Sequence, residues 1–375
     1  MRILRTGKWT ALGWLVCLLL LTSVSGIARA EPYLAIQNGY TCSNCHVNPT
    51  GGGMRTTFGD IFAQTLLPAY AAPSGSPVWT GQLLQQVLRL GGDVRTDFAR
   101  TSTPHSSTVQ QFSLEQARVY TDISIIPDRL GVYVDQLIAP GTQNMEAYVR
   151  YGNPANWYLK AGHFYLPFGW RLQDQSAFVR EVTGINMNTP DTGAEFGLKR
   201  GRLEWQIDAS NGAANQASTG QNSGGGSGYM ATTQLIYTHT SWRLGLAGSH
   251  TQSKVAGDRD MGGLFAGLRT GPVAWLGEAD VVRQAGYADG AHTLLPMIGE
   301  MDWLVHKGNN LKLTYEFYDP NTHVGHDQQT RWSIVDEFTP LPFLQIRAGF
   351  RRGQGIPQNN AQNRTLAFIE AHGFF

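Results

Sequence analysis

Two cysteines and a histidine lie close together near the start of the chain, in the run Cys42-Ser43-Asn44-Cys45-His46. In this C-x-x-C-H spacing the two thiols can bond to the two vinyl groups of a haem, and the histidine can bind the iron as proximal ligand. A zinc site is the alternative, but structural zinc takes four ligands and no further cysteine follows in the chain. The motif therefore predicts one covalent haem c on Cys42, Cys45 and His46.

The residues after the motif offer a second axial ligand for the iron. Met54 follows three glycines, whose lack of a Cβ lets the backbone approach a flat macrocycle closely. Met/His ligation is one of the arrangements that haem proteins use, so Met54 is our candidate sixth ligand. A five-coordinate iron, or a second histidine such as His163 or His372, is left open. Arg55 is a candidate partner for a haem propionate, and a solvated arginine is the alternative.

The first thirty residues have the parts of a secretory signal, which are a basic start, an apolar run and an Ala-Arg-Ala cleavage site before Glu31. A retained membrane helix is the alternative. Export is consistent with a covalent haem, which in bacteria is attached outside the cytoplasm, where a free cysteine pair would tend to oxidise. Loss of the leader removes four basic residues and no acids, which lowers the formal net charge from +1 to −3. That balance argues against a nucleic-acid partner.

From Val78 to the end, the chain repeats segments of about ten residues in which apolar and polar side chains alternate, as in the strands of a membrane barrel. Leu203 and Trp205, for example, alternate with Glu204 and Gln206. We count about sixteen such strands, and short turns alternate with longer connections, as in outer-membrane barrels. A soluble β-sandwich, or a periplasmic β protein with no membrane role, would rarely supply so many two-faced strands. The terminal Phe375 is typical of outer-membrane barrels.

The segments around the barrel define the predicted organisation. Residues 1–30 are the signal peptide, 31–77 are a small α-helical haem segment with its linker, and 78–375 are the barrel. An apolar spacing from Thr56 to Tyr70 predicts one helix that packs on the haem and ends at a proline. An even strand number places the haem segment on the periplasmic side.

Two connections stand out in the barrel sequence. The Gly/Ser/Asn/Gln tract over 212–228 is typical of a flexible external loop. The connection over 166–192 either folds into the lumen as a constriction or is an ordinary surface loop. Charges expected to face the lumen are of both signs, whereas an anion channel needs an excess of basic residues at its constriction.

Two resemblances to known families follow from these motifs. The run over 157–169, with the later Asn211-Gly212, resembles the phosphate-selective O/P porins. The whole order of signal, single C-x-x-C-H, short helix, linker and porin ending in Phe resembles the fused monohaem cytochrome–porins of the bacterial outer membrane, which include the iron-oxidase type.

The second resemblance implies a function in electron transfer, between an extracellular donor or acceptor, Fe(II) among them, and periplasmic c-type cytochromes. It leaves open whether the protein is an oxidoreductase or only an electron carrier. It also implies contact with outer-membrane lipid and leaves a homo-oligomer open. The alternative function is a porin for small polar solutes, with the haem segment as a plug or redox gate.

Overall fold

The computed structural model describes residues 31–73, 75–84, 87–212, 228–253 and 257–375. The predicted signal peptide lies outside these residues, and so does nearly all of the predicted flexible loop. In the described residues no helix is both long enough and apolar enough to cross a lipid bilayer.

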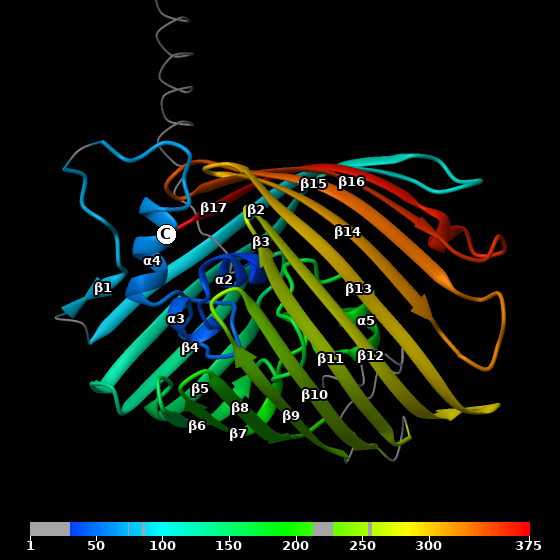
Figure 1. The fold of residues 1–375 in the computed structure, drawn as a ribbon, viewed down its shortest axis with the longest axis horizontal. Helices are drawn as coiled ribbons and strands as arrows, with labels where there is room; N and C mark the ends of the chain where they lie inside the picture. Colours follow the sequence, from blue (N-terminus) through cyan, green and yellow to red (C-terminus); the bar gives the residue numbers. More distant parts are fainter. Residues whose placement is uncertain (1–30, 74, 85–86, 213–227, 254–256) are drawn as a thin grey trace, which may run out of the picture.

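Sixteen antiparallel strands form a closed barrel, as predicted (Figure 1). Each strand pairs with the next in the chain, and β17 closes the ring by pairing with β2, where Glu370 lies opposite Asp97. Closure leaves no unpaired strand edge. The strands are β2 (Leu88–Ser102), β3 (Val109–Ile126), β4 (Leu130–Ala139), β5 (Gln143–Asn153), β6 (Trp157–Phe164), β7 (Asp191–Arg200), β8 (Leu203–Ser210), β9 (Gly228–Thr238), β10 (Trp242–Ser253), β11 (Arg259–Thr270), β12 (Val273–Tyr287), β13 (Gly290–His306), β14 (Asn309–Asp319), β15 (Gln329–Leu341), β16 (Leu344–Gln354) and β17 (Thr365–Phe374).

The two faces of the barrel wall differ as the alternation predicts. On β8 the side chains of Leu203, Trp205 and Ile207 are exposed, whereas Gln206 and Asp208 are buried. An outer face that is apolar and an inner face that is polar suit a barrel surrounded by lipid.

The first strand begins later than its sequence pattern suggests. Alternation starts near Val78, but β2 begins at Leu88, and only the two-residue β1 (Gln82–Leu83) pairs with β2 before that point. The reason is a helix contact, because the Gln64 side-chain amide binds both the N–H and the carbonyl oxygen of Trp79. These bonds hold the chain against α4 instead of in the wall.

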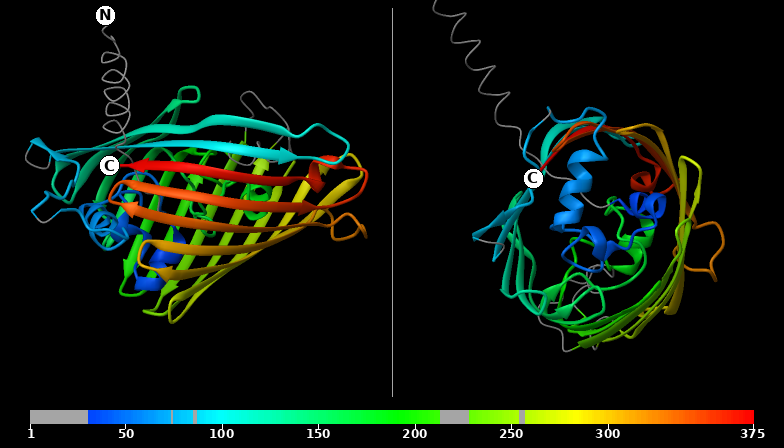
Figure 2. Two further views of the ribbon diagram at one scale, coloured as in Figure 1. Left: turned by 90° about the horizontal axis from the view of Figure 1, so that it is seen from above. Right: turned by 60° about the vertical axis from the view of Figure 1, so that its left-hand side comes forward.

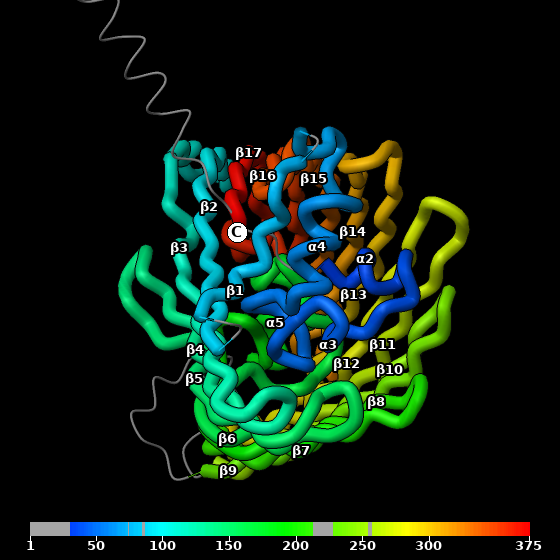
Figure 3. The backbone as a smooth tube through the Cα atoms, turned by 90° about the vertical axis from the view of Figure 1, so that its left-hand side faces the viewer, coloured from blue at the N-terminus to red at the C-terminus, as the bar shows by residue number. Residues whose placement is uncertain are grey.

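In the described residues, three short helices precede the barrel and cross its mouth at the end where the short turns lie (Figures 2 and 3). They are α2 (Pro32–Asn38), α3 (Cys42–Cys45) and α4 (Thr57–Thr65). Hydrogen bonds tie this segment to several turns. The amide of Ala69 donates to the carbonyl oxygen of Thr339 over 2.8 Å. The Lys199 ammonium donates to the Thr41 hydroxyl, also over 2.8 Å. The haem-motif segment is therefore docked in one mouth of the barrel.

The predicted helix is present but shorter than its apolar spacing suggests. The hydroxyl oxygen of Thr56 caps α4 by accepting from the Gly59 N–H over 3.2 Å. The helix ends at Thr65, three residues before Pro68. Its buried face includes Gly59 and Ala63.

The connection between β6 and β7 folds into the lumen, so the first of the two alternatives for it is confirmed. It carries the short helix α5 (Phe178–Thr183), which lies inside the barrel (Figure 2). Carboxylates of the wall hold it there. Glu278 accepts from the Trp170 amide over 2.9 Å and Glu316 accepts from the Phe178 amide over 2.7 Å. This lumen loop, residues 165–190, and the N-terminal helices together fill much of the interior.

Candidate functional site

The Cys-x-x-Cys pair is held by a single turn of helix. The N–H of Thr41 donates to the Asn44 side-chain oxygen over 2.8 Å, and the N–H of His46 donates to the carbonyl oxygen of Cys42 over 2.9 Å. Residues three apart on a helix share a face, so this turn presents Cys42 and Cys45 side by side. Both are free thiols. The spacing that the motif requires is thus realised in the fold.

A tight hairpin follows the motif and returns the chain to it. His46 pairs with Arg55 in an isolated antiparallel bridge, and the Val47 N–H donates to the carbonyl oxygen of Met54 over 2.9 Å. Gly53, next to Met54 in the returning arm, has φ +62°, and a Cβ there would collide with the Tyr133 hydroxyl. Glycine is therefore required where the hairpin meets the barrel wall.

Cys42, Cys45 and His46 line one hollow of about 930 Å³, part of it open to solvent. Its apolar walls come from distant parts of the chain, with Phe62 on α4, Trp170 on the lumen loop and Ile236 and Phe265 on β9 and β11. The fold thus builds one pocket around the motif from the N-terminal segment, the lumen loop and the wall.

Two buried arginines that sequence reasoning missed also line this hollow. Arg171 and Arg243 are only 8% and 2% exposed. Arg171 donates to the carbonyl oxygen of Leu166 over 2.8 Å, and Arg243 donates to the Thr238 hydroxyl over 3.1 Å and lies 3.8 Å from the Cys42 sulfur.

Neither guanidinium forms an ion pair with any described residue. The hollow does contain two carboxylates, Glu31 and Glu204, but these pair with Lys312 at 2.9 Å and with Lys199 at 3.1 Å. Burial lowers the pKa of Arg171. A buried charge without a counter-charge is costly, so the hollow is suited to an anionic ligand.

The motif histidine has the protonation state that metal binding needs. His46 is 3% exposed, and its Nδ1 has no hydrogen-bond partner among the described residues. Burial, helped by the Arg55 charge, lowers the pKa of His46 to about 4. A neutral imidazole is the form that binds metal ions. Burial also raises the pKa of the Cys45 thiol to about 11, so this thiol is protonated at neutral pH.

These groups fit a haem c. Two adjacent thiols match its two vinyl groups, a buried neutral imidazole matches its iron, two buried cations match its two propionates and the apolar walls match its ring. Besides His46, the described residues that line the hollow include no second histidine, methionine or lysine. In the described part of the chain no group of three or more His, Cys, Asp or Glu side chains is arranged to hold a metal ion.

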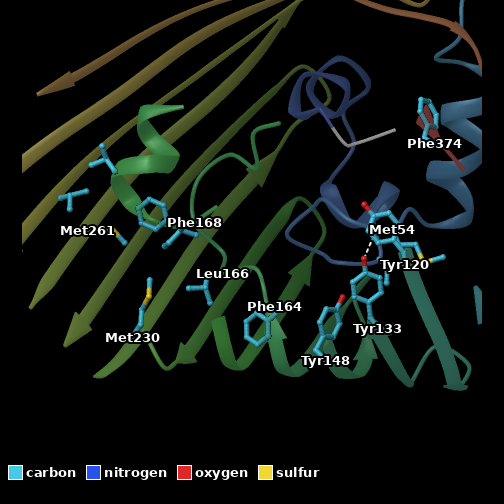
Figure 4. Packing of buried hydrophobic residues seen from close by; sticks show 14 of the residues in the cluster. Met54, Tyr120, Tyr133, Tyr148, Phe164, Leu166, Phe168, Met230, Met261 and Phe374 are labelled. Atoms are coloured by element: carbon cyan, nitrogen blue, oxygen red, sulfur yellow. Dashed lines mark hydrogen bonds between the residues drawn. The ribbon is translucent and has the colours of Figure 1, made fainter. Parts of the chain in front are cut away.

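Met54 and Arg55 lie differently from the sequence expectation. The Met54 side chain lies beside Tyr120 (Figure 4). It is buried and lines a small hollow with Gly91 and Tyr120, and neither cysteine lines that hollow. Arg55 reaches the hollow, but its guanidinium already lies 3.7 Å from Asp60 and 4.7 Å from the Phe374 ring centroid. Met54 as sixth ligand stays a prediction to which the present arrangement adds no support.

The two other histidine candidates also lie outside the hollow. His372 is fully buried in the wall, where its ring contacts Arg95 at 3.1 Å and Gln345 at 3.2 Å. His163 is on β6, with its Nδ1 3.0 Å from the Thr192 hydroxyl. Neither is among the described residues that line the cysteine-containing hollow.

Solved structures with the same fold are porins, although sequence comparison finds no relatives. No protein-family model and no curated protein sequence matches the chain. An anion-selective porin from Comamonas acidovorans superposes with a TM-score of 0.62 at 10% identity, over 77% of this chain and 99% of that one. OmpT of Vibrio cholerae gives 0.59 at 9% identity, over 78% and 99%. OprB of Pseudomonas putida gives 0.58 at 7% identity, over 77% and 94%. The chain therefore has the fold of a sixteen-stranded porin, with a segment docked in its mouth that carries the C-x-x-C-H motif.

Proposed function

We propose that this protein is a porin-like barrel of the bacterial outer membrane whose periplasmic mouth is closed by a segment bearing one covalent haem c. The single observation that carries the haem assignment is the shared hollow, in which Cys42, Cys45 and His46 meet the unpaired guanidiniums of Arg171 and Arg243. The porin fold and the apolar outer face support the membrane location. The N-terminal segment lies at the end of the barrel that carries the short turns, and in outer-membrane barrels that end is periplasmic.

Each residue of the hollow has a definable task in this proposal. Cys42 and Cys45 anchor the group, and His46 supplies its axial ligand. Arg171 and Arg243 balance the two propionates, and the aromatic walls exclude water. A bound haem iron supplies a one-electron couple, whose potential depends on ligation and on the charge and burial around it.

The first candidate role is a porin for small polar solutes in which the haem segment is a plug or redox gate. The porin neighbours favour this role, and so does a polar hollow of about 1,420 Å³ that lies beside the lumen loop, on the far side from the helices. Arginine, carboxylate and amide side chains line this hollow, so it is suited to polar solutes. A homo-oligomer fits this role too, since the Vibrio cholerae OmpT is described in a trimer form.

The second candidate role is electron transfer across the outer membrane. The chemistry of the cysteine-containing hollow favours it, because an ordinary porin needs neither thiols nor a buried imidazole. The partners would be an extracellular donor or acceptor, with Fe(II) as one option, and periplasmic c-type cytochromes. If Fe(II) is the donor, the protein acts as an oxidoreductase.

Two measurements on protein purified from outer membranes separate these roles. Planar-bilayer conductance that changes when dithionite is added supports the redox-gated porin. A closed barrel whose Soret band shifts within milliseconds of adding Fe(II) supports electron transfer. The matched control is a Cys42→Ser/Cys45→Ser variant, which has the same barrel and lacks the thioether bonds. If neither signal depends on the two cysteines, both haem-dependent roles are wrong.

A further inference from the structure

Glu31, the residue directly after the expected cleavage site, lies inside the barrel lumen. It is 3% exposed, and its Oε2 accepts from the Lys312 ammonium of β14 over 2.9 Å. If the leader is removed after Ala30, Glu31 becomes the first residue of the mature chain. Its backbone nitrogen then changes from a neutral amide to an α-ammonium group.

The surroundings of Glu31 are short of positive charge. Lys312 lies 3.7 Å from Glu300, 3.9 Å from Asp302 and 3.4 Å from Glu337, in addition to Glu31. The second cation, Arg347, lies 3.3 Å from Glu337 and also 3.3 Å from Glu370, so its charge is shared with a carboxylate outside the group. We call Glu31, Glu300, Asp302 and Glu337 the carboxylate cluster. Its four acids share two cations.

Hydrogen bonding in the carboxylate cluster is incomplete as well. Glu31 Oε1, Glu300 Oε1 and Asp302 Oδ2 are buried without a hydrogen-bond donor among the described residues. Asp302 is fully buried and Glu31 nearly so. A buried carboxylate oxygen without a donor destabilises the fold, because its lost hydration is not replaced. The cluster therefore has room, in both charge and hydrogen bonding, for one more cationic donor.

We propose that the α-ammonium group of the mature chain is this donor, and that the plug is locked in the barrel by its own processed N-terminus. In the processing step, signal peptidase adds water across the Ala30–Glu31 bond. The leader leaves with the new carboxylate, and the Glu31 amine takes up a proton. The resulting ammonium has three N–H donors, against one in the uncleaved peptide, and belongs to the same residue as the unfilled Glu31 Oε1. This inference does not depend on haem.

N-terminal sequencing and intact mass of the protein from outer membranes give the first test. We expect the mature chain to begin at Glu31. Any other first residue overturns the proposal, whatever the outcome of the haem experiments.

A pair of insertions gives the second test. One extra serine between Ala30 and Glu31, in a variant whose cleavage after Ala30 is verified by mass, moves the ammonium by about 3.3–3.6 Å along the chain. The matched control is one extra serine after Gly75, an exposed residue at which an added Cβ would meet no other part of the described chain within 4 Å. We expect the first insertion to lower the melting temperature of the barrel and the second to leave it unchanged. Equal effects of the two insertions contradict the proposal.

Asp302→Asn, combined with the first insertion, tests the ion pair itself. Two changes that remove the same interaction are less than additive, so we expect Asp302→Asn to lower the melting temperature less in the insertion background than in the normal chain. Asp208→Asn, at a buried lumen carboxylate on β8, is the matched control and should be additive. If Asp302→Asn does not assemble, Glu300→Gln can be combined with the insertion in the same way. If the effects of the cluster substitution and of the insertion are additive, the proposal is wrong.

Discussion

The barrel lumen and the cysteine-containing hollow treat their buried cations in opposite ways. In the lumen, Arg118 lies 3.1 Å from Asp135, Lys160 lies 3.0 Å from Glu195 and Arg331 lies 2.7 Å from Glu316. In the hollow, Arg171 and Arg243 are just as buried, but neither forms an ion pair with a described residue. These three lumen cations each have a carboxylate partner, whereas the hollow leaves two cations for a ligand that the chain does not supply.

The largest loss of stability should come from removing a paired cation in the lumen. Lys312→Met takes away the central partner of the carboxylate cluster, and breaking a buried ion pair costs about 3–5 kcal/mol because it leaves uncompensated charge. We expect a loss of that size in the free energy of unfolding, measured by urea titration in detergent. An exposed lysine, Lys307→Met, is the control and should be nearly neutral. An unchanged stability in Lys312→Met would mean that the lumen network is not stabilising.

The contrast between paired and unpaired arginines can be measured directly. In a Cys42→Ser/Cys45→Ser background, Arg118→Ala should destabilise by about 3–5 kcal/mol, as expected when a buried pair is broken. Arg171→Ala should cost clearly less, because no carboxylate loses its partner. In the intact protein, Arg171→Ala should lower the haem midpoint potential, since loss of a nearby cation favours the oxidised iron. If Arg171→Ala costs as much as Arg118→Ala, the two regions do not differ as described.

Variants of Met54 and His46 test which of these residues binds the haem iron. Its side chain packs on Gly91 and Tyr120, so we expect Met54→Leu to leave the absorption spectrum of the haem unchanged. His46→Ala should alter that spectrum strongly. A spectral change in Met54→Leu would show that Met54 is the sixth ligand and that the hairpin rearranges when the group is attached.

The smallest expected effect is a pH-dependent change in melting temperature when Asp174 of the lumen loop is replaced. Burial alone would raise the pKa of Asp174, but Arg351 and Arg331 outweigh it and hold that pKa well below its usual range. A carboxyl with a depressed folded-state pKa stabilises the fold above its unfolded pKa, about 3.9, and the contribution fades as pH falls below that value. We expect Asp174→Asn to lower the melting temperature slightly at pH 6 and by less at pH 2, because the contribution disappears only as pH falls through the depressed folded-state pKa. The effect is small because the Asp174 side chain is 30% exposed. Equal shifts at both pH values would exclude this linkage.

Local patterns in the sequence predict most of the fold. The period-two alternation predicted sixteen strands, and the alternating lengths of the connections predicted which end carries the N-terminal segment. The start of the first strand could not be predicted. Val78 and Trp79 continue the alternation, but Gln64 on α4 binds the backbone of Trp79 and keeps it out of the wall. The course of the lumen loop depends on acceptors such as Glu278 and Glu316, which lie about a hundred residues or more further along the chain.

The candidate site was predictable only in part, for the same reason. Cys42, Cys45 and His46 are adjacent in sequence and carry a recognisable spacing. Arg171 and Arg243 carry no local signal, since their importance comes from a hollow assembled by the N-terminal segment, the lumen loop and β10. Arg55 was the nearest basic residue in sequence, yet it is engaged by Asp60.

The account depends on a covalent group in that hollow, so the most direct measurement is a haem stain of the denatured protein. The chain should be purified from outer membranes, separated under denaturing conditions and weighed by intact mass spectrometry. We predict a stained band and a mass increase of one haem in the natural chain and in a Ser43→Ala control, with both lost in Cys42→Ser/Cys45→Ser. A natural chain with the mass of the bare polypeptide and no stain would contradict the account.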